Sequence, residues 1–308
     1  MTYFLRGAIL SSAAFFLIYV LLSFVVATAW RLVNRHAGTW SSSLLFGIRV
    51  FPLIAAAIIT SSVVLPSFLY LEPYATSETI GVTGLTLASG GVTALVFGFA
   101  SVLVAWWNTS RLIGRWPRTA VLPNGIEADI VGIKLSRPLF LVAGVCRPQL
   151  MISEGATSIL EASEMQAAIR HELAHVASRD NLKKLVLRFA KFPFMAGLEQ
   201  CWMQAAEFAA DDAAAIDEAT AVDLASALLK VASQPNSENL PDLAMSLNPE
   251  PSAALRVRVE RLLTWKPKLR RSQTLLSFAM ALTVVGSVAA TYLPLLRYAH
   301  ELSELLVR

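Results

Sequence analysis

Charged residues are scarce in this 308-residue sequence: Asp, Glu, Lys and Arg make up 16% of the chain. A typical soluble domain contains about a quarter charged residues, and here hydrophobic residues make up 55%. This balance disfavours an ordinary soluble protein and favours a membrane protein. The formal net charge of +4 is then expected to reflect membrane topology, and direct nucleic-acid binding is not expected.

Cysteine is also scarce, because the chain contains only Cys146 and Cys201. Two widely separated cysteines exclude a disulfide framework and a cysteine-based zinc site. We expect both to pack as small, buried side chains.

Long apolar runs, by contrast, are present. Four stretches without a charged residue reach the roughly 20 residues that a membrane-spanning helix needs. They are Gly7–Trp30, Val50–Leu71, about Thr86–Trp107 and Ser272–Leu296. The first has an alternative interpretation as a signal peptide with a cleavage site near Ala29, but its apolar run exceeds the roughly 7–15 residues typical of one. We therefore expect four uncleaved helices.

The basic residues predict the orientation of these helices. Arg31, Arg35 and Arg49 flank the first loop, whereas Glu72 and Glu78 are the charges of the second. Basic clusters lie at both ends of the third loop, at Arg111–Arg118 and Lys266–Arg271. Because positive loops stay in the cytosol, the first and third loops are predicted to be cytosolic, with both termini outside. The basic clusters are also expected to contact anionic headgroups of the lipid bilayer.

The third loop is the only loop of domain size. The sequence therefore divides into residues 1–107 with three membrane helices, residues 108–271 as a cytosolic domain, and residues 272–308 with the fourth helix and a short outer tail. Ala128–Leu135 and Leu139–Ile152 are predicted strands, and helices are predicted from Glu161 onward. The expected fold class is an α-helical membrane protein with a mainly α (α+β) domain between helices three and four.

Residues 171–175 read His-Glu-Leu-Ala-His within a helical pattern. Two histidines four residues apart share one face of a helix, so both rings can reach one metal ion. Zinc binds imidazole nitrogen readily, and three protein ligands leave one position for water. Glu172 is the residue expected to accept a proton from that water and pass it to the leaving amine.

A third ligand is expected from another helix. Glu207 is the best candidate, and Glu199 is a weaker alternative. Asp211 lies one turn after Glu207 and is expected to accept a hydrogen bond from the distal ring nitrogen of a ligand histidine. A solvated acidic helix face is the alternative interpretation of this pair. Asp180 is predicted to be the N-cap of a helix at Leu182–Phe192.

The motif, the Arg179-Asp180 pair and the Glu207–Asp211 segment together resemble the BlaR/MecR-type membrane metallopeptidases, which are gluzincins. The resemblance spans the whole chain, with its specificity concentrated in residues 142–211. It implies one Zn²⁺ held by His171, His175 and Glu207, with Glu172 as general base and acid. It also implies a location in the bacterial inner membrane as a multi-pass protein.

The resemblance extends to substrate binding. It implies an edge strand near Gly144–Ile152, including Gly144, Val145 and Cys146, that pairs with an extended substrate. The segment Leu255–Leu263 resembles the closing helix of the family. Within it, Arg256 or Arg258 is a candidate for stabilising the oxyanion, and a structural salt bridge is the alternative role.

One departure limits what the resemblance implies. Beta-lactam sensors of this type carry an extracellular penicillin-binding domain after the last membrane helix, where this sequence has only Arg297–Arg308. Antibiotic sensing is therefore not expected. The expected partners are a protein or peptide substrate, with a transcriptional repressor as one candidate, and a separate sensor protein.

The leading hypothesis is thus a membrane-bound zinc endopeptidase. A non-enzymatic signalling scaffold or receptor with a structural zinc is the alternative, although a structural site has no need of Glu172. A transporter or channel is disfavoured because the four apolar segments contain no ionisable residues.

Overall fold

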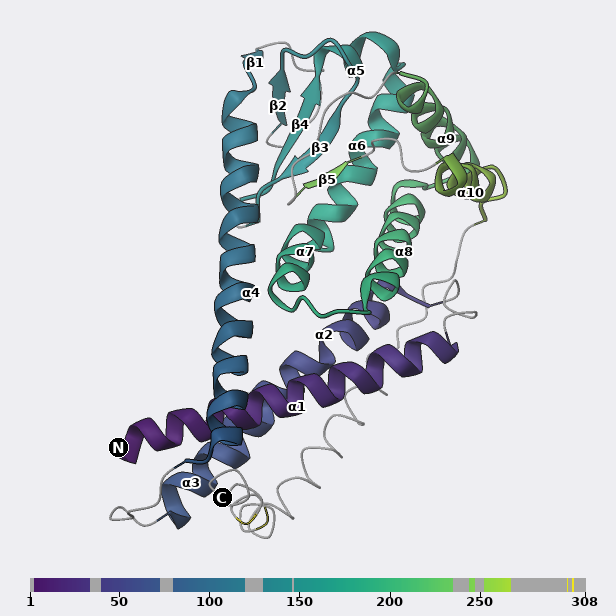
Figure 1. Cartoon of the computed structure of the whole chain (residues 1–308). Coiled ribbons are helices and arrows are strands. Elements are labelled where there is room, and N and C mark those ends of the chain that lie inside the picture. The colour runs from purple at the N-terminus through teal and green to yellow at the C-terminus, as the bar shows by residue number, and fades with distance from the viewer. Residues whose placement is uncertain are drawn as a thin grey trace. The chain divides into compact units, whose positions relative to one another are not determined.

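The computed structural model describes residues 3–33, 40–72, 80–119, 130–145, 147–234, 244–246 and 252–266, together with Tyr298 and Glu301 (Figure 1). The chain divides into two compact units. The first comprises residues 1–34, 48–98 and 269–308, and the second comprises residues 35–47 and 99–268.

Three long apolar helices are described. They span α1 (Tyr3–Val33), a continuous run from Ser42 to Leu71, and α4 (Val82–Arg115). Each is long and apolar enough to cross a membrane, and together they indicate a membrane protein. They include the first three predicted spans, whereas the fourth, Ser272–Leu296, lies outside the described residues.

The helical run from Ser42 to Leu71 comprises α2 (Ser42–Ile59), a π-helical turn (Thr60–Val64) and α3 (Leu65–Leu71). Pro66 explains the wide turn, because its ring would clash with a carbonyl of the preceding turn in a regular helix. The hydroxyl groups of Ser61 and Ser62 donate to the carbonyls of Ala57 and Ile58 at 2.8 and 2.6 Å. These bonds satisfy two polar groups inside an apolar helix.

Within the first unit, α1 and α4 approach closely. Ser12 Oγ donates to the carbonyl oxygen of Ala88 at 3.0 Å, and a Cβ at position 91 would lie 2.6 Å from the carbonyl oxygen of Ser12. Gly91 therefore permits this contact, as small residues do between membrane helices. At one end of α1, Arg6 forms an ion pair with Glu72 at 2.9 Å.

The second unit contains a five-stranded sheet of order β1-β2-β4-β3-β5. Its strands are β1 (Arg118–Thr119), β2 (Ile130–Ile133), β3 (Phe140–Ala143), β4 (Gln149–Ser153) and β5 (Ala244–Ser246). The β2–β4 pair is parallel, and the other three pairs are antiparallel. All four residues of β3 are buried, as expected for a strand covered on both faces.

The predicted single strand Leu139–Ile152 is two strands in the structure. Gly144 leaves β3 with φ +98°, a conformation that ends the extended run, and Val145 lies in the connection to β4. The prediction that Gly144 and Val145 belong to an edge strand is therefore wrong, and Cys146 lies outside the described residues. The outer side of β3 is paired with β5, where Val142 lies opposite Met245.

Six further helices are described in the second unit. They are α5 (Glu154–Ile159), α6 (Ala162–Ala177), α7 (Asp180–Phe189), α8 (Ala196–Ala214), α9 (Glu218–Ala232) and α10 (Ser252–Leu263). Helix α6 packs against β3, α8 and α9, and α10 packs against α8 and α9 (Figure 1). The resulting core places α6 at the centre of the unit, with Ala167 and Ala168 completely buried.

The start of α6 is fixed by polar contacts. Glu161 and Glu164 form a capping box that satisfies backbone N–H groups at the helix start. Glu164 also accepts hydrogen bonds from Ser226 Oγ at 2.6 Å and Lys230 Nζ at 2.8 Å on α9. These contacts fix the position of α6, which carries the His-Glu-Leu-Ala-His motif, relative to α9.

Candidate metal centre

The two motif histidines face one another on α6. The spacing of four residues places both rings on one face of the helix, where they meet edge to face with their centroids 4.8 Å apart and their Nε2 atoms 3.2 Å apart. His171, Glu172 and His175 are all buried, with at most 1% of each residue exposed. The motif therefore lies inside the domain, where water is largely excluded and electrostatic interactions are strong.

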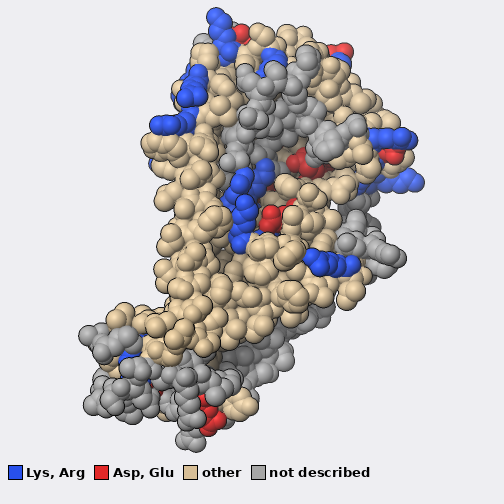
Figure 2. Space-filling model, viewed as in Figure 1, with Lys and Arg blue, Asp and Glu red and all other residues tan. Residues whose placement is uncertain are grey.

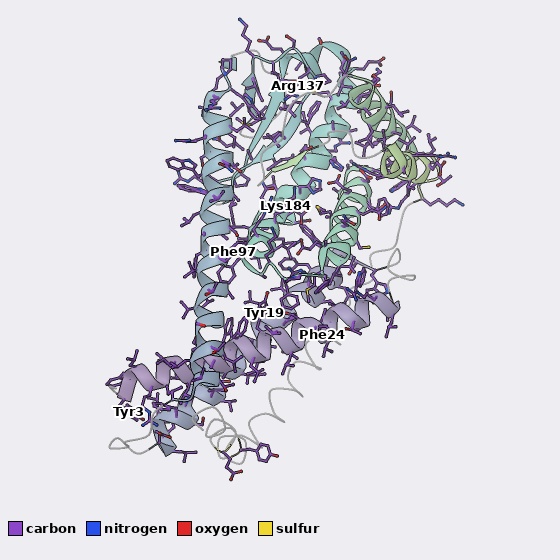
Figure 3. The ribbon with its side chains drawn as sticks, viewed as in Figure 1. Tyr3, Tyr19, Phe24, Phe97, Arg137 and Lys184 are labelled. Atoms are coloured by element: carbon purple, nitrogen blue, oxygen red, sulfur yellow. The ribbon has the colours of Figure 1, made fainter. Side chains whose placement is uncertain are left out.

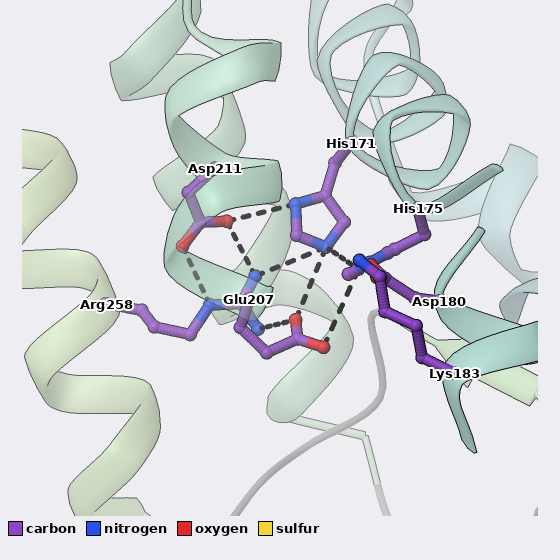
Figure 4. Close-up of polar contacts among 7 residues, drawn as sticks. All are labelled: His171, His175, Asp180, Lys183, Glu207, Asp211 and Arg258. Carbon is purple, nitrogen blue, oxygen red and sulfur yellow. Dashed lines mark hydrogen bonds and ion pairs between the residues drawn. The ribbon is translucent and has the colours of Figure 1, made fainter. Parts of the chain in front are cut away.

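Glu207 of α8 completes a group of three metal-binding side chains (Figure 4). Its carboxylate oxygens lie 3.4 Å from His171 Nε2 and 3.6 Å from His175 Nε2. The structure thus brings together the three residues that the sequence suggested as ligands. Among the described residues, Glu199 is not a member of this group, and it lies two turns earlier on α8.

The distances within this group fit zinc. Zinc–ligand bonds of about 2.0–2.1 Å in a tetrahedral arrangement place the ligand atoms about 3.3 Å from one another. The two Nε2 atoms are 3.2 Å apart, and the two oxygens of the Glu207 carboxylate each approach one of them, Oε2 at 3.4 Å from His171 and Oε1 at 3.6 Å from His175. Two imidazole nitrogens and one carboxylate are also a donor set that zinc prefers, with one coordination position left open. The site therefore fits a zinc ion.

Each ring is oriented by a carboxylate on its other nitrogen. Asp211 Oδ1 lies 3.0 Å from His171 Nδ1, and Asp180 Oδ2 lies 2.8 Å from His175 Nδ1. A carboxylate that accepts the Nδ1 proton leaves the Nε2 lone pair directed at the common point between the rings. When a metal ion takes the place of the Nε2 proton, these carboxylates favour the tautomer that metal binding requires.

The carboxylates around His171 and His175 favour positive charge between the two rings. Burial by itself lowers the pKa of His175, but the neighbouring Asp180 and Glu207 outweigh burial and raise the pKa to about 10. In Glu207, burial raises the pKa, whereas Arg258 and the two histidines hold it well below its ordinary value. The carboxylate is therefore ionised at neutral pH and available to a cation.

Asp180 was predicted to be an N-cap, and this prediction is wrong. Arg179 occupies the N-cap position with φ 54°, and Asp180 is the first residue of α7. The left-handed residue turns the chain sharply between α6 and α7, which returns the Asp180 carboxylate to His175. One carboxylate oxygen binds His175, and the other accepts a bond from Lys183 Nζ at 2.8 Å. An acidic residue five positions after a ligand histidine was the available sequence signal.

Arg258 of α10 contacts the two carboxylates that α8 contributes to the site. It is 1% exposed, and it donates to both oxygens of Asp211 at 2.7 and 2.9 Å. It also lies 3.0 Å from Glu207 Oε2. The structure therefore places Arg258 in the centre as a partner of two carboxylates, whereas its role toward an oxyanion stays a prediction. Arg256 forms an exposed ion pair with Glu260 and is not brought to the site.

Lys184 of α7 is a residue that the sequence reasoning missed. Burial lowers its pKa, and the charges of Glu207, Asp180 and Glu172 oppose that effect. Figure 3 marks its position among the helices of the second unit. A cation on α7 thus lies within electrostatic reach of the carboxylates of the centre.

A cavity of about 440 Å³ adjoins His175. It is lined by residues of the β3–β4 connection, including Gly144 and Val145, and by residues of the α6–α7 junction, including Asn181. Asn181 Nδ2 donates to the carbonyls of Val142 and Gly144 at 3.0 Å each, which ties the end of β3 to α7. This cavity is large enough for side chains of a peptide beside the metal-binding group.

Comparison with known proteins agrees with this geometry. Residues 142–258 match the model of a family described as "Peptidase family M48". The matched region contains both histidines, Glu207, Asp211 and Arg258. It supports a zinc metallopeptidase family and implies metalloprotease activity with a protein or peptide substrate. No curated protein matches the chain.

Replacing Asp180 by asparagine is expected to weaken zinc binding by about 10–100-fold, because the amide cannot orient and polarise His175 as the carboxylate does. Zinc affinity would be measured by competition with a chromogenic chelator. Asp212→Asn is the matched control, because Asp212 pairs with Arg261 rather than with a ligand histidine. Equal affinities of parent and Asp180→Asn would show that the contact with His175 has no part in metal binding.

Proposed function

We propose that this protein is a membrane-embedded zinc-dependent endopeptidase that hydrolyses peptide bonds of a cytosolic or membrane-associated protein. The observation that carries the proposal is the buried group of His171, His175 and Glu207, in which two imidazole nitrogens and a carboxylate lie close enough to bind one zinc ion. Glu172 lies beside this group on the same helix, where a hydrolytic reaction needs a proton acceptor.

The roles of the residues follow from their positions. When bound, the zinc ion supplies Lewis acidity for the attacking water and the peptide carbonyl. Glu172 accepts the proton of the attacking water and delivers it to the nitrogen of the leaving amine. Asp211 and Asp180 hold the rings of His171 and His175 in place. The cavity beside His175 receives side chains of the substrate.

The wider assignment belongs to the same proposal. The basic residues around the apolar segments support a cytosolic peptidase domain. The resemblance to BlaR/MecR-type peptidases supports a role in signalling, in which the substrate is a transcriptional repressor and a partner protein supplies the signal. That resemblance also supports the bacterial inner membrane as the location.

Metal removal tests the proposal directly. The full-length protein, purified in detergent, is expected to contain about one zinc per chain and to cleave unfolded casein. Chelation should abolish cleavage, and added zinc should restore it. The measurements are metal analysis by mass spectrometry and the appearance of new peptide termini. Cleavage that continues after complete removal of zinc would overturn the proposed chemistry.

A further inference from the structure

A second cavity, of about 320 Å³, lies along α7 beyond the metal-binding group. Three cationic side chains line it: Lys184, Arg188 and Lys191. The opposite wall comes from α8 and includes Trp202 and a single carboxylate, that of Glu199. Cations thus outnumber anions in the lining, and an apolar surface lies beside them.

The spacing of the cations is set by α7. Lys184 and Arg188 are four residues apart and therefore share one face of the helix, and Lys191 follows its end. Like charges at this spacing repel one another, so the arrangement does not favour helix formation. Arg188 lies in the last turn, where the helix dipole favours a cation, but Lys184 lies in the middle, where the dipole offers no such benefit. The stability of α7 by itself therefore does not favour a lysine at position 184.

Lys184 connects this cavity to the metal-binding group. It lines the cavity and lies one turn after Asp180, whose carboxylate is 2.8 Å from His175 Nδ1. Figure 2 shows Lys and Arg side chains gathered beside acidic side chains near the middle of the visible face. The cavity therefore begins about one helical turn from the carboxylate that contacts His175.

The size and charge of the cavity define its ligand. A volume of about 320 Å³ is at the lower end for small-ligand sites and suits one or two side chains. Lys184 and Arg188 are separated by about 6 Å along the helix, at about 1.5 Å per residue. Side chains on one face of an extended peptide repeat every two residues, or about 6.6 Å. Two acidic residues separated by one residue would therefore match the two cations.

We propose that this cavity is a substrate subsite for acidic side chains, so that the peptidase selects peptide bonds a few residues away from Asp or Glu. The inference rests on the proposed function, since it names the substrate class of the same active site. Lys184 and Arg188 supply charge-assisted hydrogen bonds to the carboxylates, and Trp202 contributes apolar lining to the same cavity.

Anionic lipid is the competing ligand. Phe189, at the end of α7, packs on Phe99 of α4 with ring centroids 5.0 Å apart, and α4 is a candidate membrane span. A headgroup phosphate could therefore approach the same helix. The position of Lys184, one turn after the carboxylate that contacts His175, favours a peptide instead, because a lipid site has no need to lie next to the metal-binding group.

The first experiment compares cleavage specificity. Full-length parent and Arg188→Glu protein, loaded with zinc in detergent, would digest a peptide library prepared from a bacterial proteome. Parent cleavage sites are expected to be enriched in Asp or Glu at fixed positions near the cleaved bond. Arg188→Glu should lose this enrichment and favour Lys or Arg there, a reversal that a merely structural role would not produce. Lys134→Glu, which changes an exposed lysine after β2, is the matched control.

The second experiment measures binding without catalysis. Fluorescein-labelled peptides with Glu-Ala repeats or Gln-Ala repeats would be titrated into zinc-loaded Glu172→Gln protein. The Glu peptide should bind at least about tenfold more tightly, and adding Arg188→Glu should remove the difference. To test the lipid alternative, the affinity of the same proteins for nanodiscs with and without phosphatidylglycerol would be measured.

The outcomes separate the two proposals. Cleavage without acidic preference overturns the subsite and leaves the peptidase standing. Selective binding of the Glu peptide by the Glu172→Gln protein, together with no cleavage by the parent protein, supports the anionic site and overturns the proposed function. A variant that loses only its affinity for phosphatidylglycerol nanodiscs, with peptide selectivity unchanged, assigns the cavity to lipid and overturns the subsite.

Discussion

Replacing Glu172 by glutamine is expected to lower peptide hydrolysis by about 10²–10⁴-fold and to leave the zinc content unchanged. Glutamine keeps the shape of the side chain but cannot accept the proton of the attacking water. Glu172 is not one of the three grouped ligands, so its replacement should not disturb metal binding. The kcat on casein and the zinc content per chain are the two measurements.

Glu218→Gln is the matched control, because Glu218 is an exposed glutamate in the first turn of α9. In cells, a comparison of protein termini should show products with the parent and with Glu218→Gln, but not with Glu172→Gln. A Glu172→Gln protein that cleaves casein as fast as the parent would remove Glu172 as the base. Identical termini in all three strains, with zinc bound throughout, would favour the signalling scaffold.

Replacing Arg258 by methionine is expected to destabilise the zinc-free protein by about 3–5 kcal/mol, because two buried carboxylates lose their shared cation. Arg258 is 1% exposed and contacts both Glu207 and Asp211. Zinc should reduce this loss, since the metal neutralises Glu207 directly and Asp211 through His171. The midpoint of thermal unfolding in detergent, with and without zinc, measures both effects.

Arg261→Met provides the comparison on the same helix. Arg261 pairs with Asp212 near the surface, where an ion pair contributes about 0–1 kcal/mol. The zinc-free Arg258→Met protein should therefore unfold at a clearly lower temperature than the Arg261→Met protein. Equal midpoints, or a loss that zinc leaves unchanged, would contradict the central position of Arg258 in the network.

Local sequence patterns were sufficient to predict the three long apolar helices that the structure describes and the histidine pair. An apolar run of about 20 residues and a four-residue spacing are properties of single helices. Both can therefore be recognised without knowing how the helix packs against the rest of the protein. The spacing of Glu207 and Asp211 likewise predicted that they share a face of α8. It could not predict which helix α8 would meet, and only the structure places Glu207 beside the histidines.

Features that depend on contacts distant in sequence or on single backbone angles were missed. The left-handed φ of Arg179 redirects Asp180 from a capping position to His175, and no side-chain pattern indicates that angle. Similarly, the positive φ of Gly144 divides one apolar run into two strands. The pairing of β3 with β5 joins residues about a hundred positions apart, beyond any periodicity.

Within the described sheet, β4 pairs with both β2 and β3, and β3 pairs with both β4 and β5. Along these registers, the neighbouring strands already occupy the backbone N–H and C=O groups of β3 and β4. An extended segment that meets β3 or β4 would therefore find few main-chain hydrogen bonds to form, so discrimination between such segments would depend on their side chains.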